Sequence, residues 1–153
     1  MRICLISREY PPDTGWGGVG AYTYQTANAL KRTGHDVQVI SLEAPEKSKS
    51  ALINSKKQAD PTSLSIPVHR VSWEDALKEL EILHIAAPSS HYILQSGMAI
   101  WKKFIQLNEV EPFDVVEAPE HLAAGIYNAI TRVAPLVLTL HTPHSKFVSE
   151  NFH

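Results

Sequence analysis

The feature that most constrains this chain is a glycine-rich stretch, residues 15–20, between a short apolar run and a helical pattern. Residues 2–7 are continuous and mostly apolar, as in strands buried on both faces, and a pair of prolines follows. From residue 19 the apolar spacing becomes helical, and Gly34 stands where a C-terminal cap is expected. The helix face expected to be buried consists of Val19, Tyr22, Thr26, Ala27 and Leu30. A strand, a glycine loop and a helix in this order bring free backbone N–H groups to one spot, which suits an anion such as phosphate.

The rest of the chain alternates strand patterns with helix patterns. Further strands are expected at residues 36–42, 66–71, 113–117 and 136–140. Helices are expected after Ser72, across residues 93–107, and from residue 121 with Leu122, Ile126 and Ile130 on one face. Residues 43–65 are polar and are expected to form a surface excursion. The alternation predicts one α/β domain over residues 1–153, a doubly wound, Rossmann-like parallel sheet with the strand order 3-2-1-4-5.

The composition argues against several classes of function. The chain has 153 residues, 44% of them hydrophobic, which is enough for one domain with a substantial core. Its formal net charge is −2 and its basic residues are scattered, so no nucleic-acid partner is expected. It shows no leader segment and no apolar run near the ~20 residues of a membrane span, so a cytoplasmic protein is expected. The single cysteine, Cys4, lies in the first strand and is expected to be a buried structural thiol.

Polar segments follow three of the expected strands at their carboxyl ends. With the order 3-2-1-4-5, the chain reverses between the first and fourth strands, and ligands of such sheets bind in the crevice outside these strand ends. The glycine stretch follows the first strand, residues 117–121 end the fourth and turn away from it, and residues 141–145 follow the fifth. The sequence therefore predicts a ligand site at this edge of the sheet.

His141 is the strongest single candidate for this site. It ends an apolar strand, and its ring could donate a hydrogen bond to a sugar hydroxyl or a phosphate oxygen, the alternative being a histidine satisfied by neighbouring backbone. Glu117 and Glu120 could be paired carboxylates for acid–base chemistry, although a glutamate at a helix start usually complements the helix dipole. Glu117 could instead hold an acceptor hydroxyl. Arg8 could meet a phosphate or stay solvated, and His121 is a weaker candidate.

Several segments resemble the opening of family-four retaining glycosyltransferases. The resemblance is carried by residues 1–12, 17–20, 30–40, 113–121 and 135–143. It covers both ends of the chain and leaves the middle unmatched. It implies the N-terminal, acceptor-side domain of the GT-B fold. It also implies a nucleotide-diphosphate sugar as donor, a carbohydrate, lipid-linked or small-molecule acceptor, and no metal cofactor.

The resemblance implies roles for individual residues as well. The glycines that would approach the donor diphosphate or the acceptor are Gly17, Gly18 and Gly20. His141 would lie beside the transferred sugar, and Thr142 would lie near the acceptor. Glycogen and starch synthases carry a lysine where this chain has Gly15, which argues against those relatives. The chain stops where a further helix should begin, so we expect the C-terminal donor-binding domain to be absent from it and the chain alone to be inactive.

Other interpretations of the same residues stay open at this point. The glycines match G-x-G-x-x-G with Glu43 as a possible ribose partner, so the alternative is a Rossmann-type module that binds a dinucleotide or a phosphorylated metabolite. The glycines could also simply permit a tight turn. His141 and His144 could begin a metal site, which needs three or more ligands. Residues 101–104 could touch a membrane surface instead of packing in the core.

Overall fold

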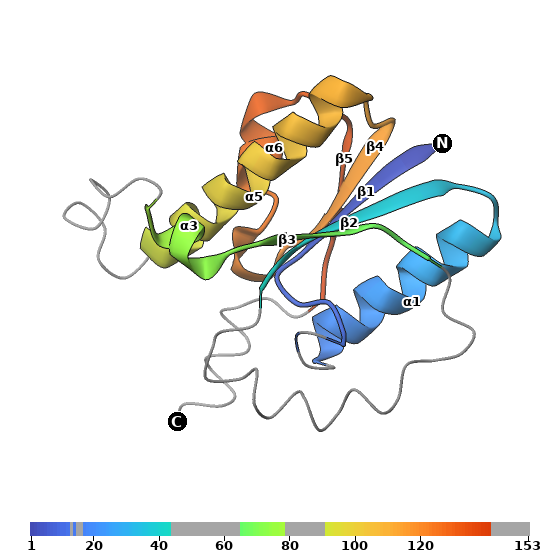
Figure 1. The fold of residues 1–153 in the computed structure, drawn as a ribbon, viewed down its shortest axis with the longest axis horizontal. Helices are drawn as coiled ribbons and strands as arrows, with labels where there is room; N and C mark the ends of the chain where they lie inside the picture. Colours follow the sequence, from blue (N-terminus) through green and yellow to red (C-terminus); the bar gives the residue numbers. More distant parts are fainter. Residues whose placement is uncertain (13, 15–16, 44–64, 79–90, 142–153) are drawn as a thin grey trace.

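Five parallel strands form one sheet in the order β3-β2-β1-β4-β5 in the computed structural model of the chain (Figure 1). The structure describes residues 1–12, 14, 17–43, 65–78 and 91–141. The strands are β1 (Arg2–Ser7), β2 (Asp36–Leu42), β3 (Val68–Val71), β4 (Val115–Pro119) and β5 (Leu136–Thr139). The helices are α1 (Gly18–Arg32), α3 (Trp73–Lys78), α5 (His91–Val110) and α6 (Ile126–Thr131), and the 3₁₀ turn η2 spans His121–Ala123. The predicted Rossmann-like fold and its strand order are confirmed.

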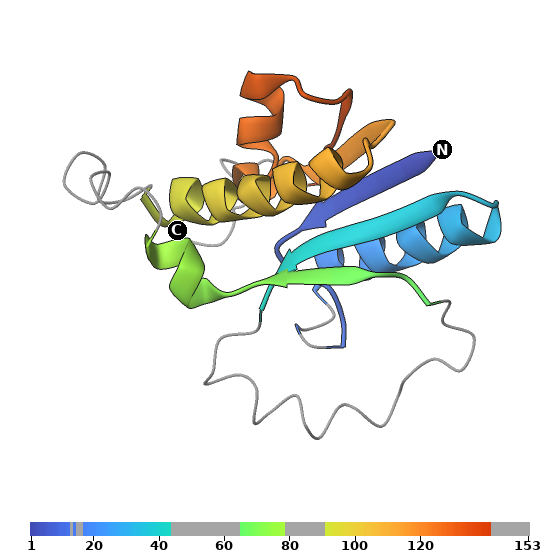
Figure 2. The ribbon, with the colours of Figure 1, turned by 45° about the horizontal axis from the view of Figure 1, so that its top comes forward.

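Helices cover both faces of this sheet, with α1 on one side and α5 on the other (Figure 2). The alternation of side chains along β1 explains the two layers. Leu5 belongs to the same buried cluster as Ala27 of α1, whereas Cys4 and Ile6 belong to the cluster that contains Phe104 of α5. Cys4 is buried as expected, and burial raises the pKa of its thiol, which keeps the sulfur protonated and unreactive.

Glycines stand at both limits of α1, as the sequence predicts. Gly17 precedes the helix, and Gly34 beyond its end has a φ of +88°, the left-handed region that favours glycine. The residues that α1 buries are Gly20, Thr23, Ala27 and Asn28. The predicted buried face is wrong at Tyr22, which is 37% exposed. Because α1 packs on β1 and β2, Tyr22 extends sideways and hydrogen-bonds to Glu117 of β4.

Helix α5 contributes a large part of the core on the other face of the sheet. Phe104 is fully buried, and its ring stacks on that of Phe113 with 5.7 Å between the centroids. Trp101 is half-buried, and its indole Nε1–H donates to the Thr131 hydroxyl at 3.2 Å. These contacts favour the core interpretation of residues 101–104 over contact with a membrane surface. Within the described residues, no helix has the length and hydropathy that crossing a membrane requires.

The segment after β4 departs from the prediction. The sequence predicts one helix there, with Leu122 and Ile130 on a shared face, but the structure has the turn η2 and the short helix α6. Leu122 and Ala123 have φ values of 52° and 48°, which break the helical path, and Ile130 is 68% exposed. A Cβ at Gly125 would lie 2.6 Å from the Cβ of Ala118, so the missing side chain lets α6 approach β4 closely.

The limits of three strands also differ from the predicted ones, and β5 ends at Thr139 instead of residue 140. β4 begins at Val115 instead of residue 113, and Phe113 lies buried just before it, under the guanidinium of Arg2. β3 begins at Val68 instead of residue 66 and is an edge strand, as Pro67 indicates. Residues 44–64, which make up most of the predicted polar excursion, lie outside the described residues, as does the predicted continuation of the helix that begins after Ser72.

The stacked pair of Phe104 and Phe113 gives a test of the core. Phe104→Ala should lower the free energy of unfolding by about 3–5 kcal/mol, because it removes a fully buried ring and leaves a cavity. Val110→Ala is the matched control on the same helix, since Val110 is 86% exposed, and it should change stability by less than about 0.5 kcal/mol. Urea denaturation of the two variants measures both values, and equal effects would contradict this description of α5.

Candidate functional site

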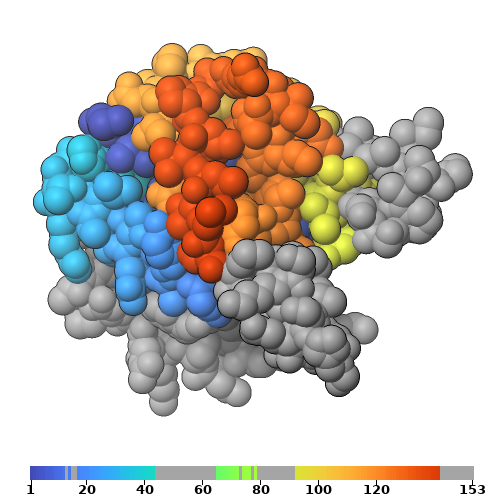
Figure 3. Space-filling model, turned by 180° about the vertical axis from the view of Figure 1, so that it is seen from behind, coloured from blue at the N-terminus to red at the C-terminus, as the bar shows by residue number. Residues whose placement is uncertain are grey.

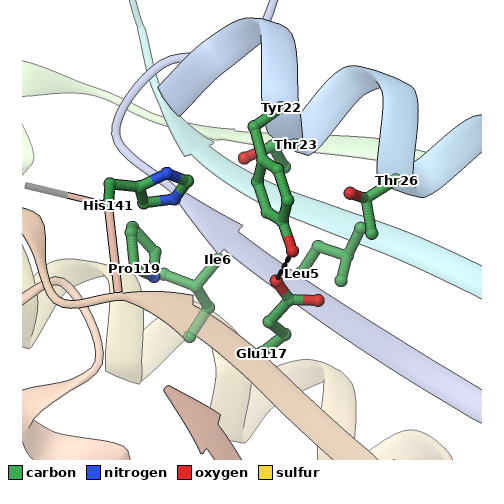
Figure 4. A pocket seen from close by; sticks show the side chains of 8 residues that line it. All are labelled: Leu5, Ile6, Tyr22, Thr23, Thr26, Glu117, Pro119 and His141. Atoms are coloured by element: carbon green, nitrogen blue, oxygen red, sulfur yellow. Dashed lines mark hydrogen bonds between the residues drawn. The ribbon is translucent and has the colours of Figure 1, made fainter. Parts of the chain in front are cut away.

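The candidate site lies where β1, β4 and β5 reach their carboxyl ends. β1 and β4 are neighbours although they are far apart in the sequence, with Leu5 paired to Glu117, and Glu117 is paired in turn to Val137 of β5. This is the point where the strand order reverses and where sheets of this type bind their ligands. A small pocket, with a cavity volume of about 10 Å³, opens there between α1 and the strand ends (Figure 4). Its described lining consists of Leu5, Ile6, Tyr22, Thr23, Thr26, Glu117, Pro119 and His141.

Glu117 is the polar centre of the pocket. Its Oε1 accepts two hydroxyl hydrogen bonds, from Tyr22 at 2.8 Å and from Thr139 at 2.6 Å. The parallel pairing explains the second bond, because Thr139 stands two residues beyond the partner of Glu117 on the same face of β5. Glu117 therefore joins the first turns of α1 to both strands of the crevice. None of the described residues donates a hydrogen bond to its other oxygen, Oε2.

His141 follows β5 and turns its ring toward the same pocket. Its backbone N–H donates to Oε2 of Glu120 at 2.9 Å, which fixes the chain where it leaves the strand. Its ring meets that of Tyr22 almost at right angles, with 4.8 Å between the centroids and 79° between the planes. The ring atom Nε2 is buried and makes no hydrogen bond with any described residue. One nitrogen of His141 therefore has hydrogen-bonding capacity that the described part of the fold does not use.

β5 is an edge strand of the sheet, next to the strand that carries Glu117. Figure 3 shows β5 at the molecular surface, between α1 and the orange segment that includes α6. Val137 is 51% exposed and Leu138 is 52% exposed, so neither face of β5 is fully covered.

The glycine stretch presents the N-terminus of α1 at the same edge of the sheet. Gly17 and Gly18 are exposed, whereas Gly20 is buried in the first turn. Among the described residues, the helix has no side-chain cap and no acidic residue in its first turn, an arrangement that suits an anion. A Cβ at Gly18 would meet no atom within 4 Å, whereas a Cβ at Gly17 would collide with the carboxylate of Glu9. The carboxylate of Glu9 therefore lies beside the N-terminus of α1.

Two arginines near this edge are engaged elsewhere. The guanidinium of Arg8 lies 5.6 Å from the ring centre of Tyr92, at the start of α5 on the other face of the sheet. Burial lowers the pKa of Arg8, and Tyr92 partly offsets this effect. Arg70 donates to the backbone oxygen of Tyr10 at 2.8 Å. Burial raises the pKa of Tyr10 to about 12, with Tyr24 adding to the shift and Arg70 opposing it.

The structure thus brings only some of the candidate residues together. Glu117 and His141 line the pocket, and Glu120 supports His141 from outside the described lining. Arg8 and His121 are not among the described lining residues. Thr142 and His144 lie outside the described residues. Among the residues that the structure describes, there is no group of three or more histidines, cysteines and carboxylates that could hold a metal ion.

Sequence reasoning missed the contribution of Tyr22 and Thr139. The sequence analysis placed Tyr22 on the buried face of its helix, and Thr139 within an apolar strand without a role. A signal for Thr139 was present, because side chains two apart on a strand share a face and His141 was already a candidate. No comparable signal pointed to Tyr22, because its role depends on how α1 is rotated relative to β4.

Geometry and comparison together identify the class of protein. A doubly wound sheet with an uncapped helix terminus and a polar pocket at its switch point is the arrangement of nucleotide- and sugar-binding α/β domains. The model of Glycosyltransferase Family 4 matches residues 16–152, nearly the whole chain. The chain therefore belongs to Glycosyltransferase Family 4, as the N-terminal part of a GT-B glycosyltransferase. A comparison with curated proteins found no match.

The hydrogen bond between Tyr22 and Glu117 can be tested by its effect on the free energy of unfolding. Tyr22→Phe should lower the free energy of unfolding by about 1 kcal/mol, because a partly exposed hydrogen bond to a carboxylate is lost. In a double-mutant cycle, Tyr22→Phe and Glu117→Ala should show a coupling of about 1 kcal/mol, measured by urea denaturation. The same tyrosine variant combined with Glu109→Ala, an exposed carboxylate on α5, serves as the control and should show no coupling. Equal couplings in the two cycles would mean that this hydrogen bond does not form in solution.

Proposed function

We propose that residues 1–153 form the acceptor-side domain of a retaining glycosyltransferase, which transfers a sugar from a nucleotide-diphosphate sugar to a hydroxyl of its acceptor. Family membership supports the transfer itself and the use of a nucleotide-sugar donor with an acceptor. The observation that carries the residue roles is the Nε2 of His141, which is buried at the switch point of the sheet and has no hydrogen-bond partner among the described residues. In this proposal a second, donor-binding domain of the enzyme supplies the nucleotide pocket, and residues 1–153 do not complete the reaction alone.

Each polar element of the edge has a role in the proposed reaction. The N-terminus of α1 receives the donor diphosphate at the exposed Gly17 and Gly18, because backbone N–H groups and the helix dipole stabilise phosphate oxygens. His141 donates a hydrogen bond to the transferred sugar, and Glu117 receives a hydroxyl of the acceptor. Catalysis is then mainly the alignment of donor and acceptor, with electrostatic stabilisation of the departing diphosphate. No resident metal ion takes part.

The role of His141 is tested by substitution in the complete enzyme. His141→Ala should lower kcat about 100-fold or more, since one hydrogen-bond donor to the reacting group is lost. Folding should be retained, because the side chain makes no hydrogen bond with the described residues. His35→Ala, in the turn between α1 and β2, is the control and should leave kcat unchanged. An unaltered rate in a folded His141→Ala enzyme would remove His141 from the mechanism.

The role of the glycine stretch is tested by a second pair of variants. Gly18→Ala should leave stability unchanged or raise it by up to about 1 kcal/mol, because a Cβ there meets no neighbour and alanine favours the helix. It should raise the KM for the nucleotide sugar about tenfold, because the methyl group stands where the diphosphate approaches. Gly34→Ala reverses this pattern: its φ of +88° strains an alanine by about 1 kcal/mol, and KM should stay the same. An unchanged KM in Gly18→Ala would place the diphosphate elsewhere.

The alternative function is a dinucleotide- or phosphometabolite-binding module without transferase activity. In a dinucleotide fold the first glycine turns the chain directly off the first strand, whereas here residues 8–17 separate the end of β1 from the start of α1. A thermal-shift comparison of NAD, nucleoside diphosphates and phosphorylated sugars separates the two proposals. Stabilisation by NAD alone would favour the alternative.

A further inference from the structure

The carboxylate of Glu120 completes the pairing between the ends of β4 and β5. Pro119, the last residue of β4, is paired with Thr139, and the backbone N–H of Glu120 donates to the backbone oxygen of Thr139 at 3.1 Å. In a parallel ladder, the next bond would run from the N–H of His141 to the backbone oxygen of Glu120. That oxygen instead accepts the N–H of Ala123 at 3.0 Å, and Oε2 of Glu120 accepts the N–H of His141 at 2.9 Å. A side chain therefore takes the place of a backbone acceptor.

The turn that follows Glu120 explains this exchange of acceptors. Leu122 and Ala123 have φ values of 52° and 48°, so the chain changes direction directly after β4. The close approach of Gly125 to Ala118 packs the segment after the turn against β4. The backbone oxygen of Glu120 bonds within this turn, and its carboxylate accepts the bond from the end of β5.

We infer that Glu120 is a positioning residue for His141. Its carboxylate fixes the backbone of His141, so that the imidazole keeps the orientation that transfer requires, and it takes up no proton during the reaction. The inference rests on the proposed function, in which His141 donates a hydrogen bond to the transferred sugar. It gives Glu120 a role through another residue, and it is an alternative to the paired acid–base chemistry that the sequence left open for Glu117 and Glu120.

The ring of His141 is restricted separately, by Tyr22 (Figure 4). The two rings meet nearly at right angles, with 4.8 Å between their centroids. Tyr22 is held in turn by its hydroxyl, which donates to Glu117 at 2.8 Å. An edge-to-face contact restricts a ring but does not fix the backbone that carries it. Glu120 and Tyr22 therefore supply different constraints, one on the backbone of His141 and one on its ring.

The bond from His141 to Glu120 is of the stronger kind, because its acceptor is ionised. Charge-assisted hydrogen bonds are roughly twice as strong as those between neutral groups. The bond lies beyond the last paired residues of β4 and β5, so it orients the end of β5 without being part of the strand pairing. Since a displacement of about 1 Å in a reacting group can lower a rate about 100-fold, the loss of this bond should appear in kcat.

The first test compares substitutions of Glu120 in the complete enzyme. Glu120→Gln keeps an oxygen that can accept the N–H of His141 but cannot act as an acid or base, so kcat should stay within about threefold of its original value. Glu120→Ala removes the acceptor, so kcat should fall at least about tenfold while the KM for the nucleotide sugar changes less than about twofold. Glu120→Met fills the same space without an acceptor and should repeat the alanine result. Glu109→Ala, which removes an exposed carboxylate from α5, is the control and should leave kcat unchanged.

A double-mutant cycle shows whether Glu120 acts through His141. In an enzyme that already carries His141→Ala, no imidazole remains to be positioned, so Glu120→Ala should lower kcat by less than about a further twofold.

The imidazole itself is followed by NMR of the complete enzyme with labelled histidine rings, in which the His141 signal is assigned from His141→Ala. Glu120→Met should move this signal, and Glu120→Gln should leave it near its original position. Both variants remove the charge, so a difference between them reports the acceptor. The signal of His35, in the turn between α1 and β2, should stay in place in both.

Three outcomes would overturn the inference. A loss of kcat in Glu120→Gln as large as in Glu120→Ala would mean that the ionisable group itself takes part in the reaction. An undiminished effect of Glu120→Ala in the His141→Ala enzyme would mean that Glu120 acts independently. Folded Glu120→Ala and Glu120→Met enzymes with an unaltered kcat would mean that His141 does not need this anchor. Failure of the proposed function looks different, because it appears as unaltered transfer by the His141→Ala enzyme, and the histidine signal then still decides whether Glu120 holds His141.

Discussion

The parallel pairing of β1 with β4 is the constraint on which the rest of the site depends. It joins the first strand of the chain to one that begins more than a hundred residues later, and it places Leu5 beside Glu117. β2 and β3 lie on one side of this pair, and β5 lies on the other. The connections that follow β1 and β4 therefore pass over opposite faces of the sheet. This leaves a crevice between α1 and the carboxyl ends of β4 and β5. The hydrogen bond from Tyr22 to Glu117 is formed across that crevice.

Glu117 accepts the hydrogen bonds that hold the two sides of this crevice together. A half-buried carboxylate without partners would be costly, so its hydrogen bonds to Tyr22 and Thr139 stabilise the fold as well as the site. They also hold the Tyr22 ring against His141, so that the imidazole has a fixed neighbour on one side and a backbone anchor at Glu120 on the other. The same few contacts therefore attach α1 to β4 and orient the side chains that would meet a substrate.

The sequence predicted the layout of the sheet better than the details of its edge. Strand and helix periods and the doubly wound rule gave the order of all five strands, and the position of His141 after the last of them placed it at the crevice. The role of Tyr22 could not be predicted, because it depends on the rotation of α1 over the sheet, which helical periodicity does not specify. The short α6 was missed for a similar reason. The contact of Gly125 with Ala118 is a tertiary effect that overrides the helical pattern.

The first turns of α1 connect the two halves of the proposed reaction. Gly18 and Tyr22 are four residues apart, so they share a side of the helix and are separated by about 6 Å along its axis. One end of this short span offers backbone N–H groups that suit a diphosphate, and the other holds a ring beside a carboxylate that suits a neutral hydroxyl. In the proposed function, the departing phosphate and the approaching hydroxyl are therefore neighbours on one rigid element. A rotation of α1 would disturb both positions together, and the hydrogen bond from Tyr22 to Glu117 opposes that rotation.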